Sequence, residues 1–168
     1  STQGSLSMSS VDSRKNSFAP LLPGIKFIRL NNKEDLEPID SSCAGVFLET
    51  IQADAGVRIP DEYYLIALKN KCSEVGALLV LDEIQVAMGR TGKLFAFEHY
   101  GIIPDLLCLG KALDGSLPIG ALVSSSSILA DFTTDPMLGH ITTFGGNPIV
   151  CAAAGELLDL LDDDLIAN

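Results

Sequence analysis

The sequence contains no tryptophan, and basic residues are scarce. Eleven Lys and Arg stand against 22 Asp and Glu, so the formal net charge is −11. Proteins that bind the phosphate backbone of nucleic acids carry basic patches, and anionic membrane surfaces attract clustered Lys and Arg. The charge balance therefore argues against both nucleic acid and membrane as partners.

Metal-binding and disulfide patterns are also missing. The four cysteines are widely spaced along the chain: Cys43, Cys72, Cys108 and Cys151. No two of them form a C-x-x-C pair, and neither histidine adjoins a cysteine, so a zinc site is not expected. Three of the cysteines have apolar neighbours, which predicts buried free thiols in a reducing compartment, with the cytoplasm as the default.

Long apolar runs are absent as well. No stretch approaches the length of a membrane span, and residues 1–20 are polar and rich in serine, without the apolar core of a signal peptide. The chain starts at Ser1 instead of methionine, which fits processing, a cloning junction or a piece of a longer protein. We expect residues 1–20 to form a loop or an element that lacks its neighbours, and residues 33–37 to form a charged turn or a short helix.

What is present is an α/β pattern. With 168 residues, of which 47% are hydrophobic and 20% charged, the chain is long enough for one domain with a core. Strands are predicted at residues 44–49, 77–81, 106–109 and 118–123, and helices at 60–75 and 149–161, the second buried on most sides. A strand, a helix and a strand at this spacing form a βαβ unit, which indicates a parallel sheet.

Polar residues stand at the ends of three of these strands. Glu49 and Asp82 end two strands, and Lys111 follows a third. Ligands of open α/β sheets lie outside the carboxyl ends of the strands. Each residue alone is ordinary, because a strand-terminal acid is most often a cap or a surface group. Together, with Gln85 close to Asp82, they suit a cofactor that needs both an amine and a carboxylate, and pyridoxal phosphate is such a cofactor.

A nucleotide hydrolase is the competing interpretation. Residues 78–83 have the apolar run and terminal acids of a Walker B strand. That class needs an upstream G-x-x-x-x-G-K-[ST] loop to hold phosphates, and the chain has none. Residues 89–93 come nearest, but their spacing is wrong and they follow the acidic strand, so we set this interpretation aside.

Several longer motifs follow one another in a characteristic order: LDEIQ at 81–85, GRTGKLFAFE at 89–98, PD at 104–105, GKAL at 110–113 and TTFGGNP at 142–148. In these motifs the chain resembles the class III (ω-amino acid) aminotransferases of the fold type I pyridoxal phosphate architecture, and most of all their acetylornithine/ornithine branch. The resemblance runs from about Cys43 to the C-terminus. It implies a mostly parallel sheet flanked by helices, incomplete in this chain.

The resemblance assigns roles to the strand-end residues. Lys111 would hold the cofactor as a Schiff base and then move the proton between substrate and cofactor. Asp82 would keep the pyridine nitrogen protonated, and Gln85 would hydrogen-bond the phenolic oxygen. Thr143, with Thr142, would bind the cofactor phosphate of the neighbouring subunit, which implies a homodimer with shared active sites. Read without the other motifs, the two threonines would instead be a β-strand pair ending in a Gly-Gly turn.

Glu49 matches an acid that, in ornithine-type enzymes, resembles a gate pairing with an active-site arginine. Such a gate lets one pocket accept either an ω-amino group or a dicarboxylate. An ordinary strand-end salt bridge is the alternative for Glu49. The family pattern is broken in two places: Asp114 replaces a glycine after the lysine, and residues 49–54 lack the usual Pro and Gly. We expect the Asp114 carboxylate to raise the pKa of Lys111 or to crowd a tight turn.

The resemblance leaves parts of the family pattern unmatched. The phosphate-binding loop, the aromatic residue stacked on the cofactor and the arginine for the substrate carboxylate are not found. We divide the chain into a polar connector, residues 1–42, and the cofactor-binding core of the large domain, residues 43–168.

The implied reaction moves the terminal amine of N-acetylornithine to 2-oxoglutarate by a ping-pong course, as in arginine biosynthesis. Ornithine or 4-aminobutyrate transamination, glutamate-semialdehyde aminomutation and an inactive fragment remain alternatives.

Overall fold

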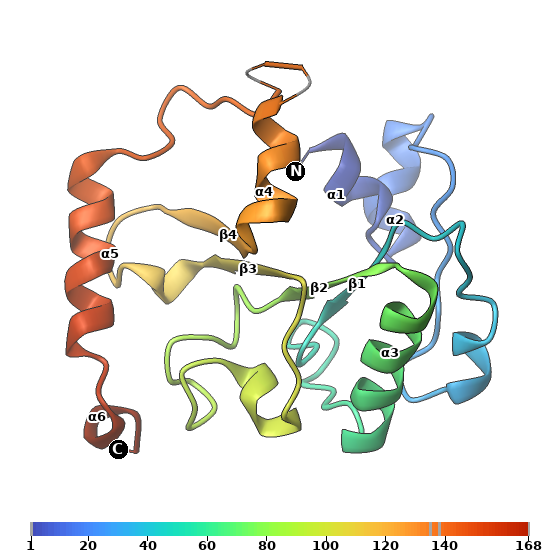
Figure 1. The fold of residues 1–168 in the computed structure, drawn as a ribbon, viewed down its shortest axis with the longest axis horizontal. Coiled ribbons are helices and arrows are strands. Elements are labelled where there is room, and N and C mark those ends of the chain that lie inside the picture. Colours follow the sequence, from blue (N-terminus) through green and yellow to red (C-terminus); the bar gives the residue numbers. More distant parts are fainter. Residues whose placement is uncertain (1, 135, 138, 168) are drawn as a thin grey trace.

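A single four-stranded sheet organises the chain in the computed structural model, which describes residues 2–134, 136–137 and 139–167. Its strands lie in sequence order: β1 (Gly45–Glu49), β2 (Leu78–Asp82), β3 (Leu106–Gly110) and β4 (Gly120–Ser124). β1, β2 and β3 are parallel, whereas β4 is antiparallel to β3. The short link between β3 and β4 explains the reversal, because a parallel partner needs a crossover of a dozen or more residues. The predicted α/β fold with a mostly parallel sheet is confirmed (Figure 1).

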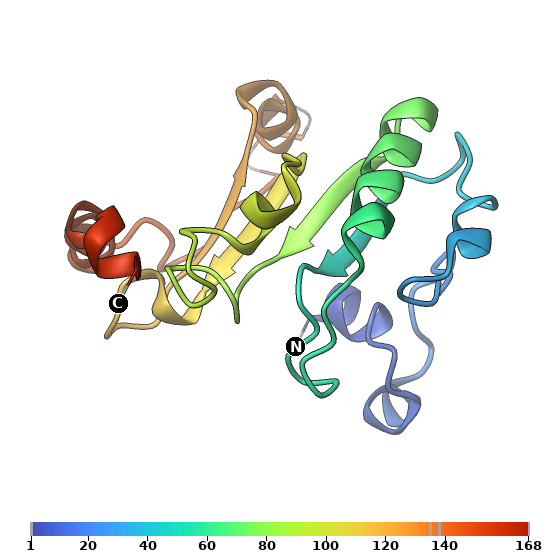
Figure 2. The same ribbon diagram turned by 90° about the horizontal axis from the view of Figure 1, so that it is seen from below.

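Helix α3 (Glu62–Val75) provides the crossover between β1 and β2. It ends at Gly76, whose φ of 77° is the left-handed conformation that a glycine tolerates best. The remaining helices are α1 (Gln3–Ser7), α2 (Asp12–Lys15), α4 (Ser126–Thr134), α5 (Pro148–Leu160) and α6 (Asp163–Ala167), with 3₁₀ turns η1 (Asn16–Phe18), η2 (Lys33–Leu36), η3 (Ala96–Tyr100) and η4 (Lys111–Leu113). α3 and α5 lie at opposite ends of the molecule (Figures 1 and 2).

The core lies between α3 and one face of the sheet. Alternate residues of a strand share a face, so Leu79 and Leu81 point to the same side, and both are fully buried. Leu65, Leu68 and Cys72 on α3 are fully buried in the same apolar cluster. The helical spacing of these three residues in the sequence predicted this face of α3 correctly.

The N-terminal segment is more ordered than its composition suggests. Residues 1–20 were expected to form a loop or an element that lacks its neighbours, and the structure shows short elements: α1, α2 and η1 occupy most of that stretch. Serine and threonine hydroxyls make this possible, because they satisfy backbone groups locally. The Thr2 hydroxyl accepts a hydrogen bond from Ser5 N at 3.3 Å, and the Ser7 hydroxyl donates to Gln3 O at 2.7 Å.

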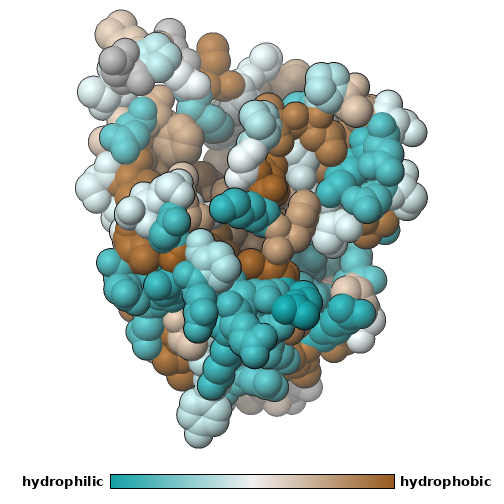
Figure 3. Space-filling model, turned by 90° about the vertical axis from the view of Figure 1, so that its right-hand side faces the viewer, coloured by the Kyte–Doolittle hydropathy of each residue, from teal (hydrophilic) through white to brown (hydrophobic). Residues whose placement is uncertain are grey.

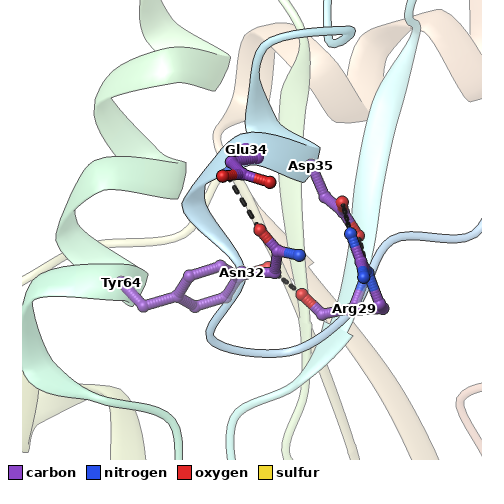
Figure 4. A network of polar contacts seen from close by, with 5 residues as sticks. All are labelled: Arg29, Asn32, Glu34, Asp35 and Tyr64. Carbon is purple, nitrogen blue, oxygen red and sulfur yellow. Dashed lines mark hydrogen bonds and ion pairs between the residues drawn. The ribbon is translucent and has the colours of Figure 1, made fainter.

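A polar network joins residues 29–35 to α3 (Figure 4). Arg29 Nε and Nη2 donate to the two carboxylate oxygens of Asp35 at 2.9 and 2.6 Å, and Tyr64 Oη donates to Arg29 O at 3.3 Å. Residues 33–37 were expected to form a charged turn or a short helix, and the structure has the short 3₁₀ helix η2 there, where Glu34 N donates to Asn32 Oδ1. On the side of the molecule that lies at the right of Figure 1, hydrophilic and apolar side chains intermingle (Figure 3).

Helix α5 forms where it was predicted, but its expected burial is wrong. Of its described residues only Ala154 is buried, while Ile149 is 71% exposed and Leu160 is 57% exposed. α5 packs mainly against η4, and no other element in the described part of the chain covers its outer side (Figure 1). Apolar composition predicts that a helix needs cover, but it does not say whether the same chain supplies that cover.

The four cysteines are free thiols with unequal exposure. Cys72 is buried, Cys43 and Cys108 are half-buried, and Cys151 is exposed on α5. The expectation of buried thiols therefore holds for Cys72 and fails for Cys151. No helix in the described part of the chain is both long and apolar enough to cross a membrane.

Candidate active site

The strand-end residues predicted from the sequence meet at one edge of the sheet. Glu49 and Asp82 are direct neighbours in the register of β1 and β2, and Asp82 pairs with Cys108 in β3. Lys111 follows the last residue of β3 and begins η4. Parallel strands bring their carboxyl ends to the same edge, so the fold itself collects an amine and two carboxylates there.

Lys111 is held in an unusual backbone conformation. Its φ is 48°, in the left-handed region that side chains with a Cβ seldom occupy, and its Nζ donates a hydrogen bond to Gln85 Oε1. Strained residues of this kind persist only where the surrounding structure holds them, and they cluster at functional sites. Gly110, just before it, leaves little room, because a Cβ there would lie 3.4 Å from Ile119 O and from Ile84 Cγ2.

Asp82 is half-buried at the end of β2, and its own turn orients it. Asp82 Oδ1 accepts a hydrogen bond from Ile84 N at 2.9 Å. This contact fixes the carboxylate at the start of the segment that carries Gln85. The amide that contacts Lys111 and the carboxylate of Asp82 therefore belong to one short, ordered turn.

Glu49 is half-buried beside Asp82. Burial is the main cause that raises the pKa of Glu49, a backbone hydrogen bond from Ala53 opposes it, and the negative charges of Asp82 and Asp54 raise it further. The positive charge of Lys111 lowers the pKa of Glu49, so the two side chains interact electrostatically. In the described part of the chain Glu49 forms no ion pair, so the ordinary salt bridge considered above is not observed.

Glu83 is a residue to which sequence reasoning gave no role. It directly follows Asp82, is fully buried, and accepts hydrogen bonds from Thr50, Ala96 and Phe97. Burial raises the pKa of Glu83, and these hydrogen bonds oppose the rise. The available signal was a second acid after an apolar strand, which by itself is typical of a solvated residue.

Thr142 and Thr143 lie apart from this group. Both are exposed in the connection between α4 and α5, and no hydrogen bond joins them to Lys111, Asp82 or Gln85 within the described residues. The alternative of a plain strand pair is wrong, because residues 143–146 form a turn without strands. Strongly exposed apolar residues, Ile141 at 71% and Phe144 at 82%, flank the two threonines.

Asp114 is buried within the loop that follows Lys111. Its Oδ1 accepts from Ser116 N at 3.0 Å, and its Oδ2 accepts from Leu117 N at 2.8 Å. The carboxylate thus satisfies the turn that it was expected to crowd, so that expectation is wrong.

Two hollows in the surface lie elsewhere. One, of about 400 Å³, is lined by residues of η2 and α3, and the other, of about 550 Å³, by residues of the N-terminal helices. Neither is lined by Lys111, Asp82 or Glu49. The chemistry of the strand ends therefore marks the candidate site.

A strand-end lysine, its amide partner and two neighbouring carboxylates on a mostly parallel sheet are features of a pyridoxal phosphate enzyme. The family model of the class III aminotransferases matches residues 1–168, so the chain belongs to that family. Class III aminotransferases depend on pyridoxal phosphate.

Individual relatives agree with this family. A putrescine aminotransferase of Pectobacterium atrosepticum is 46% identical over 159 residues, covering 90% of this chain and 34% of the relative. The ornithine aminotransferase from Toxoplasma gondii superimposes with a TM-score of 0.90 at 36% identity, over 99% of this chain and 39% of that one. The N-acetylornithine aminotransferase from Stenotrophomonas maltophilia gives a TM-score of 0.71 at 35% identity, over 84% and 36%. The chain therefore spans roughly a third to two fifths of these relatives.

Proposed function

We propose that the polypeptide containing this chain is a pyridoxal phosphate aminotransferase that moves the ω-amino group of a diamino compound to a 2-oxo acid. Residues 43–168 are its cofactor-binding core, and residues 1–42 are a connector of the same domain. The contact between Lys111 and Gln85, at the sheet edge that also carries Asp82, is the observation that supports this most strongly.

The residues present fit the cofactor. Its aldehyde needs a primary amine, its ring nitrogen a carboxylate, and its phenolic oxygen a hydrogen-bond donor. Lys111, Asp82 and Gln85 are these three groups, placed at one edge by β2 and β3. When bound, the cofactor supplies an electron sink for the bond that breaks at the substrate carbon.

The chain's own residues then divide the work. Lys111 Nζ would hold the cofactor, and the freed Lys111 amine, once a substrate amine has replaced it, would accept and return the proton at the reacting carbon. The Asp82 carboxylate, fixed by Ile84 N, would hold a proton on the ring nitrogen. The Gln85 amide, released from Lys111, would donate to the phenolic oxygen.

Thr143, with Thr142, binds the cofactor phosphate in a neighbouring subunit, so the working form is a homodimer. Two features support this proposal. Both threonines are exposed, and among the described residues no hydrogen bond joins them to the lysine site of their own chain. Exposed apolar side chains surround them, including Ile141 and Phe144, and a partner would cover such a surface.

N-acetylornithine and 2-oxoglutarate are the proposed substrates, as in arginine biosynthesis in the cytoplasm, with ornithine and 4-aminobutyrate as alternative donors. A second candidate donor is putrescine, because the Pectobacterium relative carries that name at 46% identity. The interacting negative charges of Glu49 and Asp54 also favour a donor with a cationic far end, such as putrescine. Glutamate-semialdehyde aminomutation differs from all of these, because it would yield product without an added 2-oxo acid.

Cofactor trapping tests the proposal. The 168-residue chain and the natural polypeptide that contains it are each mixed with pyridoxal phosphate, reduced with borohydride, and analysed by intact mass and peptide mapping. We expect one adduct, on Lys111, in the natural polypeptide, and none in its Lys111→Ala variant. Scattered adducts on other lysines, or none, would contradict the proposal. An adduct in the natural polypeptide but not in the chain alone would identify the latter as an incomplete fragment.

The trapped enzyme then allows donors to be compared. Each candidate amine is mixed with 2-oxoglutarate, and glutamate formation is measured. Glutamate from N-acetylornithine, with little from putrescine, would support the first candidate, and the reverse would support the second.

A further inference from the structure

Glu83 is the most completely satisfied buried acid in the described structure, and it lies next to the candidate site. Its side chain is fully buried. A buried carboxylate is costly unless its oxygens are hydrogen-bonded, so its retention requires a local reason.

Three donors from two other segments converge on this carboxylate. Thr50 Oγ1 donates to Oε1 at 2.8 Å from the residue after β1. Phe97 N donates to the same oxygen at 2.7 Å, and Ala96 N donates to Oε2 at 2.8 Å, both from the start of η3. Both oxygens are therefore used, and the side chain ties the ends of β1 and β2 to η3.

The backbone of Glu83 adds further ties. Its N–H donates to Cys108 O of β3 at 3.0 Å. Its carbonyl accepts from Val86 N at 3.1 Å and Ala87 N at 3.0 Å, which closes the turn that carries Gln85. Glu83 is thus bonded to every segment from which Glu49, Asp82, Gln85 and Lys111 extend.

The three groups that donate to the Glu83 carboxylate are all neutral, and within the described residues Glu83 forms no salt bridge. Its role is therefore one of geometry. Three donors need two acceptor oxygens, and a carboxylate is a side chain that accepts at both and donates at neither. A glutamine would place an NH₂ group against one of the donors.

We propose that Glu83 is a positioning residue, which sets Asp82 and Gln85 against Lys111 and fixes Glu49 through Thr50. This inference rests on the proposed function. The coupling is short, because Thr50 directly follows Glu49 and Glu83 directly follows Asp82. A shift of the Glu83 carboxylate is therefore transmitted to both neighbouring acids.

Three substitutions in the natural polypeptide test this role. Glu83→Gln removes one acceptor, Thr50→Val removes the hydroxyl at constant shape, and Thr50→Ser keeps it. Glu98→Gln is the matched control: Glu98 Oε1 accepts from Phe95 N at 2.8 Å at the same turn, but it is not bonded to the strand ends. Each variant is assayed well below its melting temperature, for half-saturation by pyridoxal phosphate and for trapping at Lys111.

We expect the pyridoxal phosphate concentration at half-saturation to rise about tenfold in Glu83→Gln and about three- to tenfold in Thr50→Val. These are the changes expected for the loss of one buried hydrogen bond. Thr50→Ser and Glu98→Gln should stay within about twofold of wild type. The effects of Thr50→Val and Glu83→Gln should not add in the double variant, because the two side chains are in direct contact.

The outcomes separate the two proposals. Lower melting temperatures with unchanged half-saturation and trapping would overturn the positioning role and leave Glu83 a residue of the fold alone. If Glu83→Gln does not fold, Thr50→Val against Thr50→Ser decides by the same readouts. A wild type without an adduct on Lys111 would overturn the proposed function, and this inference with it. A wild type that traps normally beside unaltered Glu83→Gln and Thr50→Val variants would overturn this inference only.

Discussion

Lys69 and Asp105 join helix α3 to the start of β3. Lys69 Nζ lies 3.0 and 2.9 Å from the two carboxylate oxygens of Asp105. The same carboxylate accepts from Leu79 N at 2.8 Å, and Ser124 Oγ donates to Asp105 O at 2.6 Å. One residue at the end of the sheet opposite the candidate site therefore contacts α3, β2 and β4.

Replacing Asp105 should destabilise the fold. Asp105→Ala leaves Leu79 N without its acceptor and Lys69 without its partner, so we expect a loss of about 1–3 kcal/mol in the free energy of unfolding. Urea denaturation measures this as a lower midpoint. Glu74→Gln is the control, because Glu74 is exposed and 3.7 Å from Lys71, and it should change stability by less than about 0.5 kcal/mol. Equal effects would show that Asp105 is only a surface charge.

The ion pair of Arg29 and Asp35 should make stability depend on acid. Hydrogen bonds from the Arg29 side chain and backbone lower the pKa of Asp35 to about 2. A carboxylate with a lowered folded-state pKa contributes stability above its unfolded value of 3.8, and loses it as the pH falls toward 2. Carboxyl carbon NMR should show this low pKa and its return toward 3.8 in Arg29→Gln. A normal pKa in the wild type would contradict the pairing.

Cysteine reactivity should follow burial. Burial raises the pKa of Cys72 to about 11, whereas Cys151 is exposed on α5. Because the thiolate is the reactive form, Cys72 should react with a disulfide reagent at neutral pH only after unfolding. In the 168-residue chain, Cys151 should be the first thiol modified, which peptide mapping detects. Rapid modification of Cys72 in the folded chain would contradict its placement.

Two glycines should respond differently to an added methyl group. A Cβ on Gly45 would lie 2.9 Å from the backbone oxygen of Leu78, so the neighbouring strand would have to move. We expect Gly45→Ala to cost about 1–3 kcal/mol, as overpacking does. Gly4 in α1 has no atom within 4 Å of its Cβ position, so Gly4→Ala should be neutral or stabilise by up to about 1 kcal/mol. Paired thermal melts compare them, and similar losses would argue against the close approach of β1 and β2.

Asp82→Asn should separate cofactor attachment from turnover in the natural polypeptide. The amide cannot hold a proton on the ring nitrogen, so we expect kcat to fall on the order of 100-fold, as for loss of one preorganised electrostatic contact. The borohydride adduct on Lys111 should persist, because the lysine is unchanged. Steady-state kinetics and mass spectrometry of the same preparation measure both. Unchanged turnover would remove Asp82 from its proposed role.

Local pattern in the sequence was enough to predict the strands, α3 and the polar residues at the strand ends. Apolar runs and helical spacing are properties of neighbouring residues, so the buried face of α3 could be predicted without any partner. The parallel order of β1, β2 and β3 follows from their connections, and it places Glu49, Asp82 and Lys111 at one edge.

Only the tertiary structure decided which of these groups touch and what holds them. The Lys111–Gln85 contact joins residues far apart in the chain, and so do the hydrogen bonds from Thr50 and Ala96 to Glu83. The left-handed backbone of Lys111 also depends on the structure around it. The exposure of α5 likewise depends on which elements pack beside it. The sequence by itself determined the residue types that the chemistry needs, because these belong to single positions. Their distances and burial arise from non-local packing, which no local pattern encodes.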